Sequence, residues 1–457
     1  MATGFLSVLD VQGGTQPPKS EFIYEPREGY VQLLQIRDFG DRAVPTYIPD
    51  TNKLKKCSEA DVLIARYGAS LGRILTGMTG AYNVAMAKVD IPPAMERRFV
   101  YYLLKSECFQ APLRLVSRSA QNGFNKEDLS GFEIPLAPLP EQKRIADKLD
   151  STLARVEACR DRLDRLPALL KRFRQSILAA ATSGRLTEDW RATRSPDEAQ
   201  RNPGTTVPES GADDQRPPKG WNALTVRDLA LDLRYGTSQK CDYREGGLPV
   251  LRIPNIGEGG KVDLTDIKRA DFASKEAEKL ALQAGDLLLI RSNGSVDLVG
   301  KCCIVEGDAV GHLFAGYLMR LRTDPKKILP WFLYFGFSAP AQRQRVELIS
   351  KSTSGVNNIN SDEVKSLPLL VPPLEEQHEI VRRVETLFAF ADRLEARLTT
   401  ARKQAEQLTP ALLARAFRGE LVPQDPNDEP ATELLKRLAT TRSEAPKAKR
   451  GRKAANA

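Results

Sequence analysis

The feature that most constrains this chain is an internal duplication near its middle and its C-terminal end. Residues 139–149 read LPEQKRIADKL, and residues 374–384 read LEEQHEIVRRV. Pro138 and Pro373 set an offset of 235 residues, which holds without a gap for about fifty residues. Further pairs at this offset are Glu141-Gln142 with Glu376-Gln377, Ile145 with Ile380, Leu178-Ala179 with Leu413-Ala414, and Gly184 with Gly419. Chance does not keep register that long, so the chain contains two copies of one unit.

Each copy predicts one long amphipathic helix, over 138–183 and 373–418. Apolar residues in the second helix step alternately by four and three, which is a heptad seam. The seam of the second helix is Ile380, Val384, Leu387, Ala391, Leu394, Leu398, Ala401, Ala405, Leu408 and Leu412. The seam of the first helix is Ile145, Leu149, Leu153, Val156, Leu163, Leu166, Leu170, Phe173 and Ile177, with either Cys159 or Arg160 at the missing step.

A seam of this length on a charged helix needs a partner, and the simplest partner is the other copy. We therefore expect two helices of about 65 Å each that pack antiparallel as a coiled coil, with one globular unit at each end. Pro167 and Pro410 lie inside these helices. Because proline removes a hydrogen bond and clashes with the preceding turn, we expect bends or breaks at both positions.

The remaining segments are assigned from composition and periodicity. Residues 1–137 and 219–372 mix short β-type runs with glycine turns, and each contains one helical stretch, at 95–116 and 328–349. Residues 184–218 form a polar linker after the helix stop at Gly184, and residues 419–457 form a polar, basic tail. The globular units are diverged copies as well, since IARYGASLGR (64–73) parallels IRSNGSVDLVGK (290–301). The matching loops differ freely, which suits two modules that read two different things.

Composition restricts the possible classes of protein. A chain of 457 residues with 41% hydrophobic content is sufficient for several folded domains. No stretch of eighteen apolar residues and no leader-like N-terminus occur, so we expect a cytoplasmic protein. Six scattered cysteines and two histidines indicate reduced thiols and predict no metal site.

The formal net charge of +9 favours a polyanionic partner. Part of this charge lies in the tail segment PKAKRGRK at 446–453. That segment fits either a solubilising end or an arm that contacts DNA, and its charge pattern does not decide between the two.

No catalytic constellation is found. The stretch GSVDLVGKC (294–302) has five residues between its glycines where a phosphate-binding loop has four, and Cys302 stands where Ser or Thr would hold magnesium. A motif for amination of bases and a nuclease carboxylate cluster are both absent. We therefore predict no catalytic residues.

Nucleic-acid binding is better supported, because the turns of both globular units carry side chains that contact base edges or phosphates. The candidates in the first unit are Lys19, Arg37, Arg66, Tyr67, Arg73, Tyr82, Asn83, Gln121, Asn122 and Lys126. The candidates in the second unit are Lys240, Arg244, Arg252, Asn255, Arg291, Asn293, Lys301, Asn357 and Asn358. Any one of them fits a solvated turn residue, but their clustering in matching loops favours a DNA-reading role.

With these segments in place, the chain resembles the DNA-specificity subunit of type I restriction-modification systems. The resemblance covers nearly the whole chain. It is carried by PLPEQKRIADKLD and PPLEEQHEIVRRVE at the two helix starts, and by RLPALLKRFRQSILAAATSGRLTEDW and LTPALLARAFRGELVPQDPNDEPA at their ends. One departure is that the second unit enters through PKGWNALTVRDLALDLRYGTSQ, whereas the first has only MATGFLSVLDVQGGTQ. This predicts either a start further upstream or an incomplete edge of the first unit.

The resemblance implies an α+β fold with two target-recognition domains of mixed α/β structure. Two long conserved helices would join them as an antiparallel coiled coil with a pseudo-twofold internal repeat. Each domain would read one half of a bipartite, asymmetric site in double-stranded DNA. The subunit would be non-catalytic and would bind no cofactor. It would recruit two modification subunits, which methylate adenine with S-adenosylmethionine, and restriction subunits that use ATP and Mg.

Two other functions remain open at this level. One is a coiled-coil scaffold that joins proteins without reading DNA. The other is an active single-chain modification enzyme. A steep loss of DNA affinity with rising salt separates the DNA reader from the scaffold.

Overall fold

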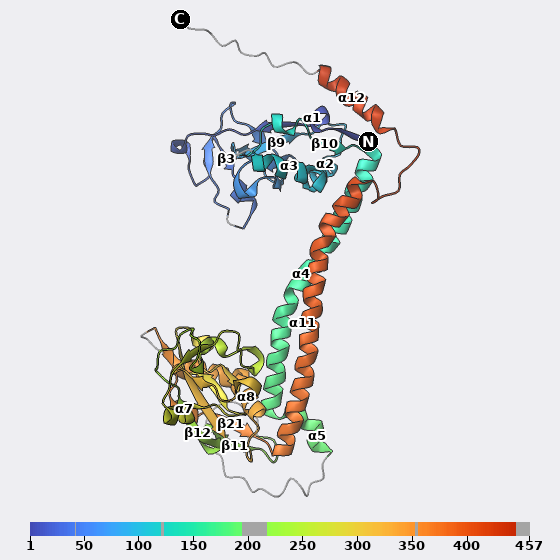
Figure 1. The fold of residues 1–457 in the computed structure, drawn as a ribbon. Coiled ribbons are helices and arrows are strands. Elements are labelled where there is room, and N and C mark those ends of the chain that lie inside the picture. Colours follow the sequence, from blue (N-terminus) through green and yellow to red (C-terminus); the bar gives the residue numbers. More distant parts are fainter. Residues whose placement is uncertain (42, 120–122, 194–216, 352–354, 445–457) are drawn as a thin grey trace. The chain divides into compact units, whose positions relative to one another are not determined.

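The computed structural model describes residues 1–41, 43–119, 123–193, 217–351 and 355–444. The chain divides into two units. Unit 1 contains Met1–Asp164 and Thr399–Ala457, and unit 2 contains Arg165–Leu398. Each unit includes one mixed α/β half together with a part of both long helices (Figure 1). Within the described ranges, no helix is both long enough and apolar enough to cross a membrane.

Unit 1 is built on two four-stranded sheets and one strand pair. The first sheet has the antiparallel order β2-β9-β6-β7, and the second has the order β4-β3-β8-β5 with β3 and β8 parallel. Their strands are β2 (Asp10–Gly13), β3 (Tyr30–Leu34), β4 (Tyr47–Pro49), β5 (Lys56–Cys57), β6 (Val62–Ala65), β7 (Ile74–Leu75), β8 (Gly80–Tyr82) and β9 (Met86–Asp90). The separate pair joins β1 (Ala2–Gly4) to β10 (Glu133–Pro135). The helices are α1 (Phe5–Val8), α2 (Arg97–Lys105) and α3 (Glu107–Ser119).

Unit 2 repeats this plan. Its antiparallel sheet has the order β12-β19-β15-β17, and a three-stranded sheet β14-β13-β18 contains the parallel pair β13 and β18. The strands are β12 (Ala230–Tyr235), β13 (Leu248–Leu251), β14 (Lys268–Ala270), β15 (Leu287–Ile290), β17 (Cys302–Ile304), β18 (Leu313–Phe314) and β19 (Leu318–Thr323). Two strand pairs join β11 (Asn222–Thr225) to β21 (Pro368–Val371), and β16 (Ser292–Asn293) to β20 (Asn357–Asn358). The helices are α6 (Val226–Leu229), α7 (Ser274–Leu280), α8 (Pro330–Ser338), α9 (Pro340–Ser350) and α10 (Ser361–Lys365).

The central strands β6 and β15 explain why the sequence shows unbroken apolar runs at VLIA and LLLI. All four residues of each strand are buried. In β15, Leu287 and Leu289 enter one hydrophobic core while Leu288 and Ile290 enter another. A strand covered on both faces has no polar side to alternate with. The strand therefore needs apolar residues at every position.

The two long helices confirm the expected helical repeat. They are α4 (Leu139–Ser183) and α11 (Leu374–Phe417), labelled in Figure 1. Within unit 1, Arg402 of α11 pairs with Asp164 of α4, and within unit 2, Arg174 of α4 pairs with Asp392. In unit 1, Arg160 of α4 also bonds to Ala405 O and Glu406 O of α11, so residue numbers rise along one helix as they fall along the other and the helices pack antiparallel. Most seam residues are buried or partly buried, but Leu166 is 38% exposed and Leu408 is 45% exposed.

The prolines do not break the helices, contrary to the expectation of a break. Both α4 and α11 continue through them as single helices. Pro410 has no N–H for the carbonyl of Glu406, four residues earlier. Arg160 of α4 supplies a donor there, with Nη2 at 3.2 Å from Glu406 O and 2.9 Å from Ala405 O. Arg160 therefore fills the missing seam step, while Cys159 is exposed.

The repeated Glu-Gln at each helix start has a structural purpose. Gln142 is buried, and its side chain donates to Ala137 O and accepts from the backbone N–H of Glu96. Gln377 does the same with Pro372 O and the backbone N–H of Leu329, and also donates to Lys327 O. Each glutamine therefore ties a long helix to the start of the helical segment of its own half.

Four details differ from the sequence expectations. The stretch 95–116 forms two helices, α2 and α3, separated at Ser106, and the stretch 328–349 forms α8 and α9, separated at Ala339. The linker begins with ordered turns at η5 (Arg185–Thr187) and α5 (Glu188–Ala192). The tail contains a helix, α12 (Ala431–Glu444), which buries two leucines in the core of unit 1.

Candidate nucleic-acid interface

In unit 1, the ends of three strands and one loop meet around Arg66. Gly14 follows β2 and packs so closely on β8 that a Cβ atom would lie 2.1 Å from Asn83 O, so only glycine fits there. Thr15 N then donates to Tyr82 O at 3.1 Å. A Cβ atom on Gly13 would lie 2.9 Å from Arg66 Nη1, which places the guanidinium against the end of β2. The strand ends therefore form a platform beneath Arg66.

Arg66 is held in one orientation by neutral groups. Its Nε donates to Phe124 O at 3.1 Å, and its Nη2 donates to Asn125 Oδ1 at 3.0 Å. The guanidinium also lies over the rings of Tyr67, at 5.2 Å from the centroid, and Phe124, at 5.9 Å. Nη1 has no hydrogen-bond acceptor among the described residues. A pre-oriented guanidinium with a free donor can contact a guanine edge or a phosphate.

The other candidates of unit 1 fall into two groups around this platform. Asn83 lies on it and accepts from Ala85 N, and exposed Lys126 forms an ion pair with Asp10 at 2.6 Å. Arg73 directly precedes β7 and donates to Phe39 O, the last residue of the short helix that carries exposed Arg37. Lys19 is exposed and is not brought to either group by any contact between described residues.

Unit 2 repeats the arginine arrangement with Arg291. The backbone N–H of Arg66 donates to Ala85 O and that of Arg291 donates to Tyr317 O, so the two residues hold the same place at the end of the central strand. Arg291 lies over the Tyr235 ring, at 4.5 Å from the centroid. Its Nη2 donates to Asn358 Oδ1 at 3.2 Å and its Nη1 to Gly316 O at 3.3 Å. Both units thus present an arginine held by an aromatic ring and an asparagine.

The strand pair β16–β20 brings Asn293 and Asn357 next to Arg291. These residues pair across the two strands, and Asn357 Nδ2 donates to Gly294 O at 3.0 Å. Lys301 is exposed at the end of the turn that follows β16, whereas Lys240 is exposed and is linked to this group by no contact in the described ranges. The structure therefore gathers Arg291, Asn293, Asn357 and Asn358 into one surface cluster.

Arg244 and Arg252 are already paired with carboxylates. Arg244 forms ion pairs with Asp242 and Asp271, and Arg252 pairs with Asp266 at 3.0 Å. The hydrogen bonds from Arg244 lower the pKa of Asp242, and those from Tyr243 and then Arg252 lower the pKa of Asp266. Both carboxylates are therefore ionised at neutral pH, and these arginines would have to exchange partners to reach DNA.

Two candidates are corrected by the structure and two lie outside it. Tyr82 is fully buried, its hydroxyl hydrogen-bonds with Gln12 O, and burial raises the pKa of its phenol. Asn255 is 1% exposed, and its amide donates to Asp263 O and Asp266 O. Both side chains stabilise their loops and present no polar group at the surface. We therefore remove Tyr82 and Asn255 from the candidate DNA-contacting residues. Gln121 and Asn122 lie outside the described residues.

Some members of the clusters were missed in the sequence. Tyr235 and Asn125 complete the two arginine arrangements, and the Gly-Thr pair at 14–15 recurs at 236–237 with the same backbone hydrogen bond. The signal was present, because VQGGT and LRYGT both end in Gly-Thr. A comparison of the two lead-ins by their glycines would have found it.

The titratable groups of the described residues do not form a reaction centre that we can identify. Burial raises the pKa of Cys302 and raises that of Cys303 to about 12, so both remain thiols. Burial lowers the pKa of His312. No cluster of three or more His, Cys, Asp or Glu side chains able to hold a metal ion occurs in the ranges that the structure describes.

Comparison with known proteins follows the internal repeat. The family model described as the type I restriction modification DNA specificity domain matches residues 7–167 and again residues 218–401. The specificity subunit of type I restriction enzyme EcoKI of Escherichia coli (strain K12) is 36% identical over 330 residues, which are 71% of this chain and 66% of that protein. The StySPI specificity subunit of Salmonella potsdam is 33% identical, with the same two shares. The EcoBI specificity subunit of Escherichia coli is 30% identical over 92% of this chain and 85% of that protein.

Solved structures share the architecture. The crystal structure of the HsdS subunit from Thermoanaerobacter tengcongensis aligns with a TM-score of 0.60 and 18% identity, over 92% of this chain and 97% of that chain. A chain from a structure of the type I R-M system, concerned with its assembly and conformational transition, aligns with a TM-score of 0.60 and 19% identity, over 92% of this chain and 98% of that chain. At this level of identity, the likeness establishes the fold. The matched stretch spans 66% of the length of the EcoKI and StySPI subunits.

Proposed function

The chain belongs to the family of type I restriction-modification DNA specificity subunits, and on that premise we propose that it reads a two-part site in double-stranded DNA. Each mixed α/β half reads one part. The observation that carries this proposal is the repeated arginine arrangement, in which Arg66 and Arg291 leave equivalent strands and are held by an aromatic ring and an asparagine.

The two halves are built to read different sequences. Of the two rings over Arg66, the nearer comes from Tyr67, the residue that follows it, whereas the ring over Arg291 comes from Tyr235 on another strand. Lys126 accompanies the first arginine, and the asparagine pair 293 and 357 accompanies the second. Because different donors and acceptors select different base edges, the two half-sites differ and the whole site is asymmetric.

We assign no catalytic step to this chain, and we propose that chemistry belongs to its partners. Two modification subunits would bind the repeated helical scaffold and methylate adenine with S-adenosylmethionine. Restriction subunits that use ATP and Mg would join that complex, in the cytoplasm. Support for these partners comes from family membership. We expect two modification subunits to co-purify with each copy of this chain. A stable complex with one modification subunit per chain would contradict the twofold arrangement.

The decisive experiment is selection of duplexes from a randomised DNA pool by the full-length chain, alone and with its modification subunits. We expect two short enriched motifs separated by a fixed number of unread base pairs. The logarithm of the affinity should fall linearly with the logarithm of salt concentration, because bound phosphates release counterions. A chain that enriches no motif and binds DNA independently of salt would instead be a protein scaffold.

A further inference from the structure

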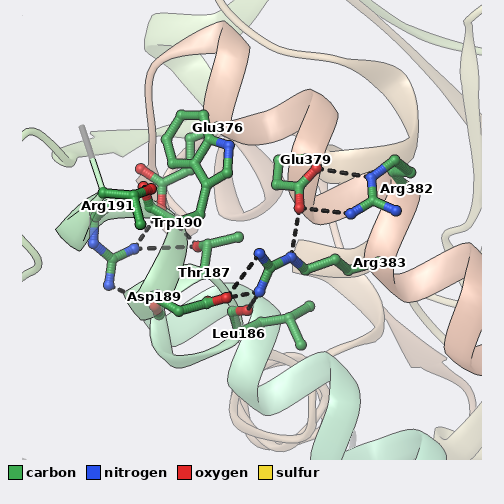
Figure 2. Close-up of polar contacts among 11 residues, drawn as sticks. Leu186, Thr187, Asp189, Trp190, Arg191, Glu376, Glu379, Arg382 and Arg383 are labelled. Atoms are coloured by element: carbon green, nitrogen blue, oxygen red, sulfur yellow. Dashed lines mark hydrogen bonds and ion pairs between the residues drawn. The ribbon is translucent and has the colours of Figure 1, made fainter.

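The start of α11 shows how a buried glutamate of the repeat is satisfied (Figure 2). Glu376 is 2% exposed. It accepts hydrogen bonds from Thr187 Oγ1 at 2.7 Å and from Trp221 Nε1 at 3.0 Å, and it forms an ion pair with Arg191. Arg191 also donates to Gly184 O and lies over the Trp221 ring. The carboxylate is therefore surrounded by an indole, a hydroxyl and a guanidinium.

Glu141 holds the same position in the first copy but has none of these partners. It is 7% exposed, and it makes no hydrogen bond or ion pair with a described residue. Burial raises the pKa of its carboxyl group. The side chain faces a cavity of about 330 Å³ in unit 1, whose lining includes Met1, Phe99, Pro138, Phe417 and Asp428. A cavity of this volume lies in the range of small-molecule sites.

Strand register shows which positions of the two copies correspond at this point. Ala2 pairs with Pro135, and Ala223 pairs with Leu370. Because Pro135 and Leu370 are separated by the repeat offset of 235, Ala2 corresponds to Ala223. Trp221 lies two residues before Ala223, so its counterpart is the position directly ahead of Met1. The cavity beside Glu141 therefore occupies the place that the indole of Trp221 fills in the second copy.

We propose that the cavity beside Glu141 is a binding site for an indole, whose ring N–H donates to the Glu141 carboxylate as Trp221 does to Glu376. The indole N–H is a donor without acceptor capacity, and an ionised carboxylate is an acceptor without donors, so the pair is complementary. The rings of Phe99 and Phe417, with centroids 5.3 Å apart, border the cavity and supply apolar contact. This site is independent of DNA reading.

The indole can reach the cavity from two sources. One is a tryptophan attached ahead of β1, as Trp221 is attached ahead of β11. The other is a free indole compound or the tryptophan of another chain. In the free case a positive charge on the ligand should help if it lies beside Glu141 and Asp425, since Asp428 is already paired with Arg144 and Arg418 also lines the cavity.

The attached source is tested by adding Lys-Gly-Trp directly ahead of Met1, behind a new initiator methionine. The matched control adds Lys-Gly-Phe, which fills the cavity but cannot donate a hydrogen bond. We expect the tryptophan extension to raise the Tm of the full chain by about 2–4 °C above the phenylalanine extension. Its added fluorescence should be blue-shifted, as for a buried indole. In the Glu141→Met background, which removes the acceptor, the difference should vanish.

The free source is tested by calorimetric titration of the unextended chain with tryptamine, using indole-3-acetate as the oppositely charged control. Saturable binding at millimolar concentration, lost in Glu141→Met, identifies a ligand supplied from outside the chain. A tryptophan-specific gain in Tm without tryptamine binding identifies the residue ahead of β1 as the source. Equal Tm values for the two extensions together with no tryptamine binding would overturn the proposal, as would a tryptophan gain that persists in Glu141→Met.

Discussion

Glu376 and Glu141 occupy the same position in two copies of one repeat, yet their surroundings differ. Glu376 lies in a complete hydrogen-bond network in unit 2, whereas Glu141 faces a cavity in unit 1. The glutamine that follows each glutamate makes two equivalent backbone contacts in both copies, and Gln377 makes a third to Lys327 O. The repeat therefore preserves the tie between helix and globular half, while the surroundings of the carboxylate differ between the two copies.

The largest expected effect is the difference in stability loss between removing the carboxylate of Glu376 and removing that of Glu141. Glu376→Met leaves the Trp221 N–H, the Thr187 hydroxyl and the Arg191 guanidinium without their acceptor, at a cost of about 3–5 kcal/mol. Glu141→Met removes a group with no hydrogen bond among the described residues and should change stability by about 1 kcal/mol or less. Urea unfolding of both variants measures the contrast. Equal losses would show that the two sites are energetically alike despite their contacts.

The second contrast concerns the two reading surfaces. Arg66→Ala should relax recognition of one half-site and Arg291→Ala recognition of the other, each by about 1–3 kcal/mol if the arginine contacts a base. Competition binding with duplexes altered in one half-site at a time measures this. Lys19→Ala and Lys240→Ala are the controls, because exposed lysines that contact phosphate weaken all duplexes alike. A loss in both half-sites from either arginine substitution would contradict independent halves.

The third contrast compares two arginines that cross between the long helices. Arg160→Met removes the donor to the carbonyls beside Pro410 and should cost about 1–2 kcal/mol. Arg174→Met removes ion pairs with exposed Asp392 and Glu395 and should cost at most about 1 kcal/mol. Thermal unfolding measures which substitution costs more stability. Addition of 0.5 M salt should reduce the stability loss of Arg174→Met and leave that of Arg160→Met unchanged. A larger loss from Arg174→Met than from Arg160→Met would mean that the carbonyls of Ala405 and Glu406 find other donors.

The smallest effect is the pH dependence of the Glu141 contribution to stability. The pKa of Glu141 is raised in the folded chain above its ordinary value of 4.5. Ionisation therefore costs the folded state stability as pH rises from the unfolded to the folded pKa, and this cost is absent below the unfolded pKa. Glu141→Gln, which cannot ionise, should equal the parent at low pH and exceed it at neutral pH. Urea unfolding midpoints of both proteins at several pH values test this. A stability advantage of Glu141→Gln that grows as the pH falls would contradict the prediction.

Periodicity and repetition predicted much of this fold from the sequence. The heptad seams gave both long helices, and apolar runs such as LLLI gave the central strands. The helix break at Ser106 was missed because no proline or glycine stands there, whereas the break at Ala339 was missed although Pro340 follows it directly. The continuity of α11 through Pro410 was also missed, since it depends on Arg160 from a distant part of the chain.

The candidate interface was harder to predict. Arg66 and Arg291 were found because the strand before each is recognisable, but residue type could not separate exposed from buried polar side chains. Tyr82 and Asn255 have the chemistry of base-reading residues, yet both are used inside their own loops. Tyr235 was overlooked because its role depends on the neighbouring strand that brings it over Arg291. Local pattern gives the strands, whereas tertiary contacts decide which polar groups face outward.

The contacts of Gln142 and Gln377 have a consequence for how far the sequence of each half can vary. Their partners in the globular halves and at the helix entrances are main-chain groups of Glu96, Ala137, Lys327, Leu329 and Pro372. Because these glutamines bind main-chain groups, their hydrogen bonds do not require a particular side chain from the half that they hold. A half with different loops could form the same two bonds. Exchange of a whole half would therefore need no matching change in the helices.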